Sequence, residues 1–266
     1  MTAYEVTDGD GFRLADHDPG ADSGVAGKAE GRAEVAELTA RLAELHDTFY
    51  ADGRRSLLVV LQGMDTSGKG GALRKAFRGL DPVGVHVAAF KAPTDIELDH
   101  DFLWRIHPHA PARGHISIFD RSHYEDVLIV RVHDLVPEER WRARYDAIRS
   151  FEQMLVDEGT VVRKFFLHIS REEQAERLRA RLANPTKHWK FRLADLEERK
   201  HWDDYQAAYE EAIRRTATPD APWIVVPADK KWHRDLVVCR TIVATLEGLD
   251  LRYPEPEEDL SGVVVE

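Results

Sequence analysis

Residues 56–77 read SLLVVLQGMDTSGKGGALRKAF, and this stretch decides the fold. Its first seven residues contain an apolar run with two β-branched valines, which predicts a short buried strand, and its last nine predict a helix. Between them, Gly63, Gly68 and Lys69 have the GxxxxGK spacing of a phosphate-binding loop. Glycines let backbone amides converge on one point, where the helix N-terminus and the lysine ammonium add positive charge. The alternative interpretation is a glycine-rich turn with an exposed lysine.

Strands and helices alternate along the rest of the chain, which predicts an α/β fold with a parallel central sheet. We expect helices at about 32–50, 69–77, 97–106, 137–157, 171–216 and 232–247, and strands at 56–62, 85–90, 115–120, 161–169 and 223–227. Residues 1–30 read as an N-terminal arm that is ordered against the body or a partner subunit. Residues 31–255 form the expected domain, and 256–266 form an acidic, proline-bearing tail that we expect to cover part of the surface.

The charge balance limits the classes of partner. The 266 residues include 37 Lys or Arg and 48 Asp or Glu, a formal net charge of −11. Such a chain repels nucleic acid and anionic membranes on average, so an anion site requires a local concentration of basic residues. The sequence has no apolar run long enough to span a membrane and no leader-like N-terminus, so we expect a cytoplasmic protein. Its one cysteine, Cys239, lies in an apolar helical stretch and is predicted to be a buried thiol.

Two aspartates are candidate metal ligands. The position after Lys69, where a phosphate loop usually has a hydroxyl that binds Mg²⁺, is Gly70, so another group must hold the metal. Asp65 lies within the loop, and Asp120 ends the predicted strand 115–120, one βα unit later. Carboxylates at this end of a parallel strand commonly organise the metal in phosphate-loop enzymes, so Asp65 and Asp120 should meet across the phosphate site.

Arginines follow the same strand. Arg121 comes directly after Asp120, and Arg131 lies ten residues later on the next predicted helix. Guanidinium groups stabilise the charge of a transferring phosphoryl group, although both could be ion-pair partners of nearby acids instead. His123 opens a second route through a phosphohistidine, which direct transfer does not need.

Residues 177–192 read RLRARLANPTKHWKFR and contain six Lys or Arg residues, one histidine and no acid. Solvated helix faces usually mix both signs, so this segment predicts an anion-binding lid, within about 171–200. Asn184 and Pro185 divide it into two helices, as in a hinged cover that excludes water. Trp189 is either a base-stacking or a core residue.

Several motifs, in unbroken order from about residue 30 to 255, resemble the polyphosphate kinase 2 family of polyphosphate:nucleotide phosphotransferases. They are GMDTSGKGG, FKAPTD, DFLWRIH, FDRSHYEDVLIVRV, NPTKHWKF, HWDDY and APWIVVPADKKW. The resemblance implies a three-layer α/β/α phosphate-loop kinase fold with a helical lid. It also implies Mg²⁺, with Mn²⁺ as an alternative, and transfer between inorganic polyphosphate and AMP or ADP, with guanine nucleotides also open. Family members form homodimers or homotetramers, and we expect one of these states here.

The resemblance also carries site residues over by position. Asp65 and Asp120 match the metal-associated aspartates, and Lys69, Arg121 and Arg131 match the other catalytic positions. The implied phosphate- and nucleotide-binding residues are Gly63, Met64, Thr66, Ser67, Gly68, Gly70, Lys91, Glu125, Arg177, Arg181, Lys187 and Lys190. Glu125 stands where many members carry asparagine, which resembles the class III branch that acts on both AMP and ADP. Gly70 is usual for the family.

The resulting hypothesis is a direct, in-line phosphoryl transfer in which Mg²⁺ bridges donor and acceptor oxygens. Two other functions are weighed against it. One is a nucleoside or nucleoside-monophosphate kinase that consumes ATP, and the other is a phosphate-sensing protein without catalysis. The metal-organising set of Asp65, Lys69, Asp120 and Arg121 disfavours the second, because binding alone does not require it.

Overall fold

The computed structural model describes residues 4–260 and 263–265. In this part of the chain, one six-stranded sheet has the strand order β1-β6-β5-β2-β4-β3. The strands are β1 (Glu5–Val6), β2 (Ser56–Gln62), β3 (Val85–Ala89), β4 (Ile116–Asp120), β5 (Thr160–His168) and β6 (Trp223–Pro227). Strands β2 to β6 pair in parallel, and β1 adds an antiparallel edge to β6. The predicted parallel sheet is confirmed, with each of the five predicted strands within one residue of its expected bounds.

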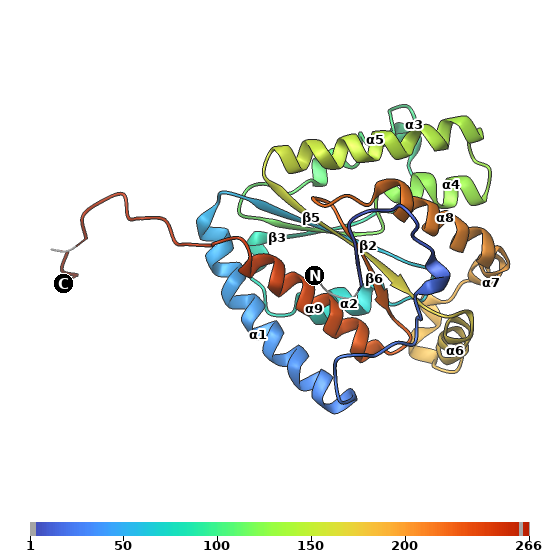
Figure 1. The fold of residues 1–266 in the computed structure, drawn as a ribbon, viewed down its shortest axis with the longest axis horizontal. Helices are drawn as coiled ribbons and strands as arrows, with labels where there is room; N and C mark the ends of the chain where they lie inside the picture. The colour runs from blue at the N-terminus through green and yellow to red at the C-terminus, as the bar shows by residue number, and fades with distance from the viewer. Residues whose placement is uncertain (1–3, 261–262, 266) are drawn as a thin grey trace.

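Helices cover both faces of the sheet, which gives the expected three layers (Figure 1). The helices are α1 (Lys28–Asp52), α2 (Lys69–Ala76), α3 (Asp95–Leu98), α4 (Ile129–Val132), α5 (Glu138–Asp157), α6 (Arg171–Leu182), α7 (Ala194–Glu198), α8 (Trp202–Thr216) and α9 (Lys231–Glu247). On one face α9 packs against α1 and α2, and on the other α5 packs against α8 and β5. All seven residues of β2 are buried because both faces are covered, which explains its continuous apolar sequence.

Short 3₁₀ helices connect these elements: η1 (Leu14–Asp16), η2 (Pro82–Gly84), η3 (His107–His109), η4 (His123–Val127), η5 (Pro185–Lys190) and η6 (Arg199–His201). The segment predicted to be the lid, residues 171–200, consists of α6, η5, α7 and most of η6, rather than of the two helices expected from the break at Asn184 and Pro185. It lies at the end of the sheet toward which β5 points (Figure 1).

The helix predicted at 97–106 is wrong. Only Asp95–Leu98 is helical, and it begins with a capping box between Thr94 and Glu97. The Asp101 carboxylate then accepts a hydrogen bond from the Leu103 amide at 2.9 Å. Such a local turn competes with helical backbone pairing, so the chain continues in turns up to η3.

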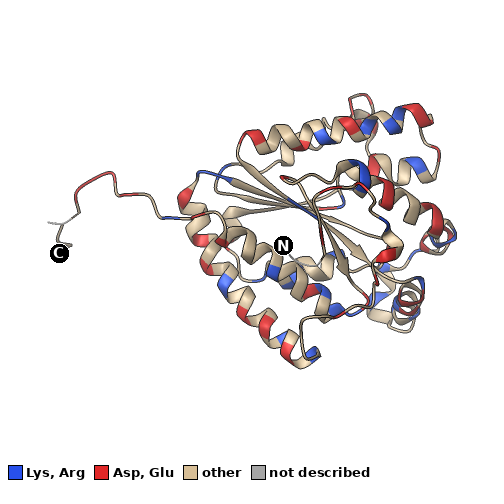
Figure 2. Ribbon diagram, in the orientation of Figure 1, with Lys and Arg blue, Asp and Glu red and all other residues tan. Residues whose placement is uncertain are grey.

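The two termini behave differently. The N-terminal arm is ordered against the body: Phe12 and Leu14 are buried, and the Leu14 amide donates to Glu210 Oε2 at 2.8 Å. Directly after α9 the chain still contacts the body: the carbonyls of Leu249 and Asp250 accept from Arg55 and Arg54 at 2.8 Å, and the Tyr253 hydroxyl donates to Asp47 at 2.6 Å. Residues 254–260 instead extend away from the body as an acidic segment, contrary to the expected surface wrapping (Figures 1 and 2). Prolines and neighbouring acids favour an extended chain there, because the acids repel one another.

Cys239 is fully buried, as predicted, and burial raises the pKa of its thiol to about 12. Across residues 4–260 and 263–265, no helix has both the length and the apolar character needed to cross a membrane.

One buried histidine makes the fold sensitive to acid. Burial lowers the pKa of His168, at the end of β5, from 6.5 to about 4. Between those values the unfolded chain binds a proton that the folded chain does not, so this group's contribution to stability falls as the pH falls from 6.5 to 4. The slope is at most about 1.4 kcal/mol per pH unit. Urea unfolding between pH 4.5 and 7.5 should therefore show a shallower pH dependence for His168→Gln than for the wild type. Equal slopes would contradict this.

Candidate active site

The loop between β2 and α2 has the backbone geometry of a phosphate cradle. Thr66 and Gly68 have φ values of 67° and 103°, in the left-handed region. A Cβ atom on Gly68 would lie 2.0 Å from Arg234 Nη1, so glycine is required there for both conformation and space. The loop then enters α2, whose first-turn amides at Gly71 and Ala72 bond back to the Gly68 carbonyl. The predicted strand, loop and helix are confirmed.

Lys69 is held at the inner side of this loop. Its Nζ donates to the carbonyl of Gly63 at 2.6 Å and lies 3.4 Å from that of Met64. Burial lowers the pKa of Lys69, and the Arg121 guanidinium lowers it further, whereas the carboxylates of Asp65, Asp120 and Glu125 oppose the shift. The ammonium therefore lies among three acids, next to the point where a phosphate would enter.

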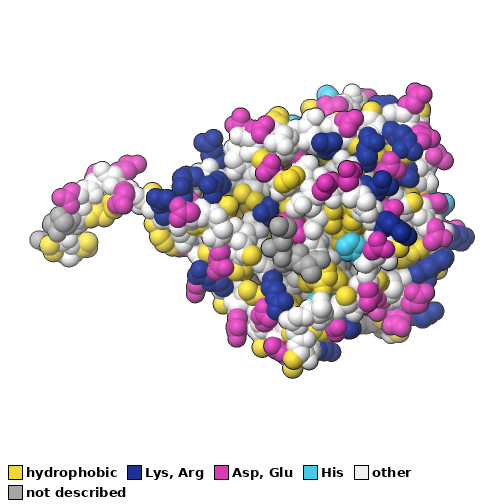
Figure 3. Space-filling model, viewed as in Figure 1, with side chains coloured by type: hydrophobic (Ala, Val, Ile, Leu, Met, Phe, Trp, Pro, Cys, Tyr) yellow, Lys and Arg dark blue, Asp and Glu magenta, His cyan; other side chains and the backbone are white. Residues whose placement is uncertain are grey.

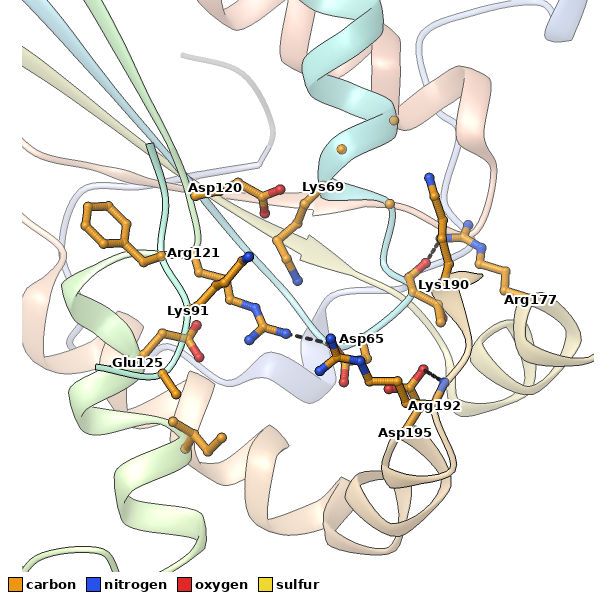
Figure 4. A pocket seen from close by; sticks show the side chains of 18 of the residues that line it. Asp65, Lys69, Lys91, Asp120, Arg121, Glu125, Arg177, Lys190, Arg192 and Asp195 are labelled. Carbon is orange, nitrogen blue, oxygen red and sulfur yellow. Dashed lines mark hydrogen bonds and ion pairs between the residues drawn. The ribbon is translucent and has the colours of Figure 1, made fainter. Parts of the chain in front are cut away.

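Asp120 and Arg121 reach the loop because β4 pairs beside β2. The register places Leu61 opposite Asp120, so the end of β4 adjoins the start of the loop. Arg121 has a φ of 65°, its amide donates to the Leu61 carbonyl at 3.1 Å, and its Nη2 donates to Asp65 Oδ1 at 3.0 Å. Asp65, Asp120 and Arg121 face one space together with Lys69 (Figure 4).

This space is a cavity of about 1190 Å³ between the carboxyl ends of the strands and the lid. Two groups of its lining residues come from different segments of the chain. The lid, α2 and α9 contribute Arg74, Arg181, Lys187, Lys190, Arg192 and Lys231, which we call the basic side. Segments 89–98 and 129–136 contribute Phe90, Pro93, Leu98, Val130, Leu135 and Val136, which we call the apolar side, and the charged residues Lys91, Asp126 and Arg144 also line the cavity. On the face drawn in Figure 3, acidic and basic side chains are mixed. The concentration of positive charge that the sequence required is thus found in the cavity.

Most of the predicted site residues line this cavity. They are Asp65, Thr66, Gly68, Lys69, Gly70, Lys91, Asp120, Arg121, Glu125, Arg177, Arg181, Lys187 and Lys190. Gly63 and Met64 line a smaller adjoining cavity of about 200 Å³, and Ser67 is buried beneath the loop.

Arg131 does not line either cavity. It lies on α4, where Nη1 donates to Glu211 Oε2 at 2.7 Å and the guanidinium stacks 4.8 Å from the centre of the Trp141 ring. The structure thus places Arg131 in the ion-pair environment that the sequence left open as the alternative.

Arg177 lines the cavity, but its donors are already used within the protein. The guanidinium donates to the carbonyls of Thr66, Ser67, Ala228 and Asp229 and to the Glu173 carboxylate, at 2.6 to 3.0 Å. An arginine has five N–H donors, so none remains for a ligand. Arg177 therefore does not act as a lid residue that binds substrate. It fixes α6 to the phosphate loop and to the segment after β6.

The lid's outer basic residues are more available. Lys190 lies 4.6 Å from the centre of the Trp189 ring, and that ring is 77% exposed, so Trp189 is not a core residue. Arg181 Nη1 lies 3.9 Å from Asp195, a lid carboxylate that also faces the cavity. Exposed cations on short helices can reorient toward an anion at low cost.

Sequence reasoning missed five basic residues of the cavity, Arg74, Arg144, Arg192, Lys231 and Arg234. Arg192 is the last cation of the basic segment, and Lys231 lies within the motif APWIVVPADKKW, so the sequence offered a reason to consider both. It offered none for Arg74, Arg144 and Arg234, because a basic residue on a helix is ordinarily a surface residue.

The position of His123 excludes a phosphohistidine intermediate at that residue. The His123 side chain is fully buried, and its Nε2 lies 3.2 Å from Glu152 Oε1. It lines neither cavity, so the phosphohistidine alternative has no route to a substrate. Glu125, two residues later, does line the cavity, and burial raises the pKa of its carboxyl while Arg121 and Lys69 lower it less strongly.

The carboxylates fit a divalent metal. Within the described residues, no group of three or more His, Cys, Asp or Glu side chains is arranged as a metal site. Of the three carboxylates near the Lys69 ammonium, Asp65 comes from the loop and Asp120 from the end of β4, and Glu125 is the third. Magnesium is commonly held by one or two carboxylates, with water and substrate phosphate oxygens completing the shell, so a pair beside a phosphate loop is sufficient.

Known proteins share both sequence and fold with this chain. Residues 26–254 match the family described as Polyphosphate kinase 2 (PPK2). The AMP/ADP-polyphosphate phosphotransferase of Meiothermus ruber is 51% identical over 267 residues, which cover 100% of both chains. The ADP-polyphosphate phosphotransferase of Rhodopseudomonas palustris is 46% identical over 81% of this chain and 78% of its own.

The crystal structure of polyphosphate kinase 2 from Arthrobacter aurescens TC1 superposes with a TM-score of 0.94 at 46% identity, over 97% of this chain and 93% of the other. The matched region includes the loop, β4, the lid and α9. The chain belongs to the polyphosphate kinase 2 family.

Proposed function

We propose that this protein is a Mg²⁺-dependent phosphotransferase that moves a phosphoryl group between inorganic polyphosphate and AMP or ADP. One observation carries the proposal: the cavity that is lined by Lys69, Asp65, Asp120 and Arg121 is also lined by the residues of both the basic side and the apolar side. A donor that is a polyanion without a base and an acceptor that bears one fit such a divided cavity.

The basic side suits polyphosphate. Arg181, Lys187, Lys190 and Arg192 come from the lid, and Arg74 and Lys231 come from α2 and α9. A row of cations from separate elements can contact successive phosphates of a linear chain, and release of counterions adds to the affinity. The net charge of the whole chain, −11, disfavours nonspecific binding of other polyanions outside the cavity.

The apolar side suits a nucleoside. Phe90, Leu98, Val130, Leu135 and Val136 come from segments 89–98 and 129–136, which are separate in the chain from the lid that supplies most of the cations. Leu98 and Leu135 are 65% and 62% exposed, so a base placed there would bury apolar surface that is otherwise in contact with water. The Meiothermus relative is named for both AMP and ADP, which supports both acceptors here.

Each part of the proposed transfer can be assigned to residues of this chain. Lys69 and the loop amides bind the terminal phosphate, and Arg121 lies where charge develops between donor and acceptor. Asp65 and Asp120 would hold the metal, which when bound neutralises charge on donor and acceptor oxygens. The lid cations orient the donor and exclude water. No step requires a covalent intermediate.

Donor and acceptor choice provide the first test. Purified protein mixed with Mg²⁺ and long-chain polyphosphate should convert both AMP and ADP to higher phosphates, as measured by nucleotide chromatography. Products from ADP alone would keep the family but reject the class III assignment. Turnover with ATP and none with polyphosphate would establish the ATP-consuming kinase instead, and binding without turnover would establish the phosphate-sensing alternative.

Removal of the loop lysine should reduce turnover rather than binding alone. Lys69→Ala takes away a buried ammonium beside the transferred phosphate and should lower kcat about 100-fold or more. Initial rates at saturating polyphosphate and nucleotide measure this, with Lys200→Ala as a matched control because Lys200 is an exposed lid-side lysine paired with Glu197. A kcat near the wild-type value would remove Lys69 from the mechanism.

Lid lysines should act on the donor alone. Lys187→Ala and Lys190→Ala are each expected to raise the KM for polyphosphate, with little change in the KM for ADP. Each should also reduce the slope of log KM against log salt by about 1. A titration from low to high NaCl measures both effects. An equal rise in the KM for ADP would mean that the basic side does not belong to polyphosphate.

A further inference from the structure

A buried ion pair lies behind the active site, between the sheet and the helices on one of its faces. Lys164 on β5 and Glu152 on α5 join through Nζ and Oε2 at 2.6 Å, and their side chains are 0% and 2% exposed. The Lys164 ammonium also donates to the Tyr124 hydroxyl at 3.1 Å and to the Thr216 carbonyl at 2.8 Å. All three ammonium donors therefore have partners.

Two residues of η4 complete this network. The Tyr124 hydroxyl lies 2.8 Å from Glu152 Oε1 and 2.9 Å from Thr216 Oγ1, and His123 Nε2 lies 3.2 Å from the same Glu152 oxygen. Tyr124 and His123 are both fully buried. The charged pair is thus bonded directly to the short segment that separates Arg121 from Glu125.

That segment has a demanding conformation. Arg121 has a positive φ of 65° without being glycine, a strained conformation that persists only where the surroundings impose it. From β2, Gln62 Nε2 donates to Ser122 Oγ at 3.1 Å, and from the other side Tyr124 and His123 are held by Glu152. The two anchors fix the turn that presents Arg121 and Glu125 to the cavity.

Stability alone does not account for such a network. Replacing a buried ion pair by apolar residues of similar volume is often neutral or stabilising, because desolvation of the charges offsets much of their attraction. A polar network instead favours one geometry over its neighbours, because its hydrogen bonds are directional. The Lys164 ammonium and both Glu152 carboxylate oxygens have partners, whereas His123 Nδ1 and Gln62 Oε1 have none among the described residues. Here the geometry that it defines is that of η4.

We propose that Lys164, Glu152 and Tyr124 are positioning residues that act through the turn at η4 to hold Arg121 and Glu125 in the geometry required for phosphoryl transfer. This inference rests on the proposed function for its catalytic consequence. Its structural part, that the network holds the turn, stands independently.

The test compares two variants that each remove one buried hydroxyl. Tyr124→Phe breaks the link between the network and η4. Thr160→Val is the matched control. Thr160 lies on β5, the same strand as Lys164, but at the end of the sheet away from the cavity, and its hydroxyl makes a buried 2.9 Å hydrogen bond to Ser56 Oγ on β2. Urea unfolding measures the stability lost by each variant.

The rate of amide hydrogen exchange measures directly how firmly the turn at η4 is held. The Arg121, Tyr124 and Glu125 amides bond to the Leu61 carbonyl, the Ser122 hydroxyl and the Ser122 carbonyl. Tyr124→Phe should speed exchange in a peptide that covers residues 120–128, whereas Thr160→Val should leave it at the wild-type rate. Unchanged exchange in Tyr124→Phe would overturn the proposal, whatever the donor of the reaction.

Steady-state kinetics test the catalytic part of the proposal, that the network positions Arg121 and Glu125. Tyr124→Phe should lower kcat by about 10-fold to 100-fold, as expected for a misplaced charge-stabilising group, while the KM for polyphosphate stays unchanged. In an Arg121→Ala background, Tyr124→Phe should cause a clearly smaller fall, because one of the two groups through which it acts is absent. A kcat equal to that of Thr160→Val, or a full additional fall in the Arg121→Ala background, would overturn positioning through Arg121.

An absence of wild-type turnover with polyphosphate would overturn the proposed function instead. The hydrogen-exchange rates would still decide whether the network holds the turn.

Discussion

The hydrogen bond between Arg121 Nη2 and Asp65 Oδ1 is the constraint on which the active site depends. It joins the end of β4 to the middle of the phosphate loop, two segments separated by 56 positions in the chain. Parallel pairing of β2 with β4 brings them together, and the left-handed backbone at Arg121 turns the guanidinium back toward the loop. With this bond in place, the loop lysine, both aspartates and the arginine share one cavity.

The rest of the molecule supports that junction electrostatically. Three basic side chains approach the loop from behind or from the lid: Arg177 bonds to its carbonyls, Arg234 packs against Gly68, and Lys231 faces the same cavity. Their charge is concentrated in a chain that is otherwise acidic, so the cavity attracts a polyanion while the outer surface repels one. The same loop thus combines a rigid backbone with a strongly positive surrounding.

Local signals in the sequence were enough for the sheet, the loop and the two aspartates, because strand periodicity and glycine spacing depend on neighbouring residues. They were not enough where a residue's partner lies far along the chain. Arg131 pairs with Glu211, 80 positions away, and Arg177 is saturated by carbonyls about 50 and 110 positions away. The helix expected at 97–106 failed for a local reason, since the Asp101 carboxylate competes with the helical backbone. Side-chain chemistry of that kind is invisible to apolar periodicity.

The central claim is that the junction of Lys69, Asp65, Asp120 and Arg121 passes a phosphoryl group directly from donor to acceptor. The most direct measurement is a single-turnover reaction with ³²P-labelled polyphosphate, followed by denaturation and separation of protein from nucleotide. The account predicts no label on the protein, with or without nucleotide, and label in the nucleotide product whenever AMP or ADP is present. Labelled protein that forms without nucleotide and transfers its label to added ADP would contradict the account.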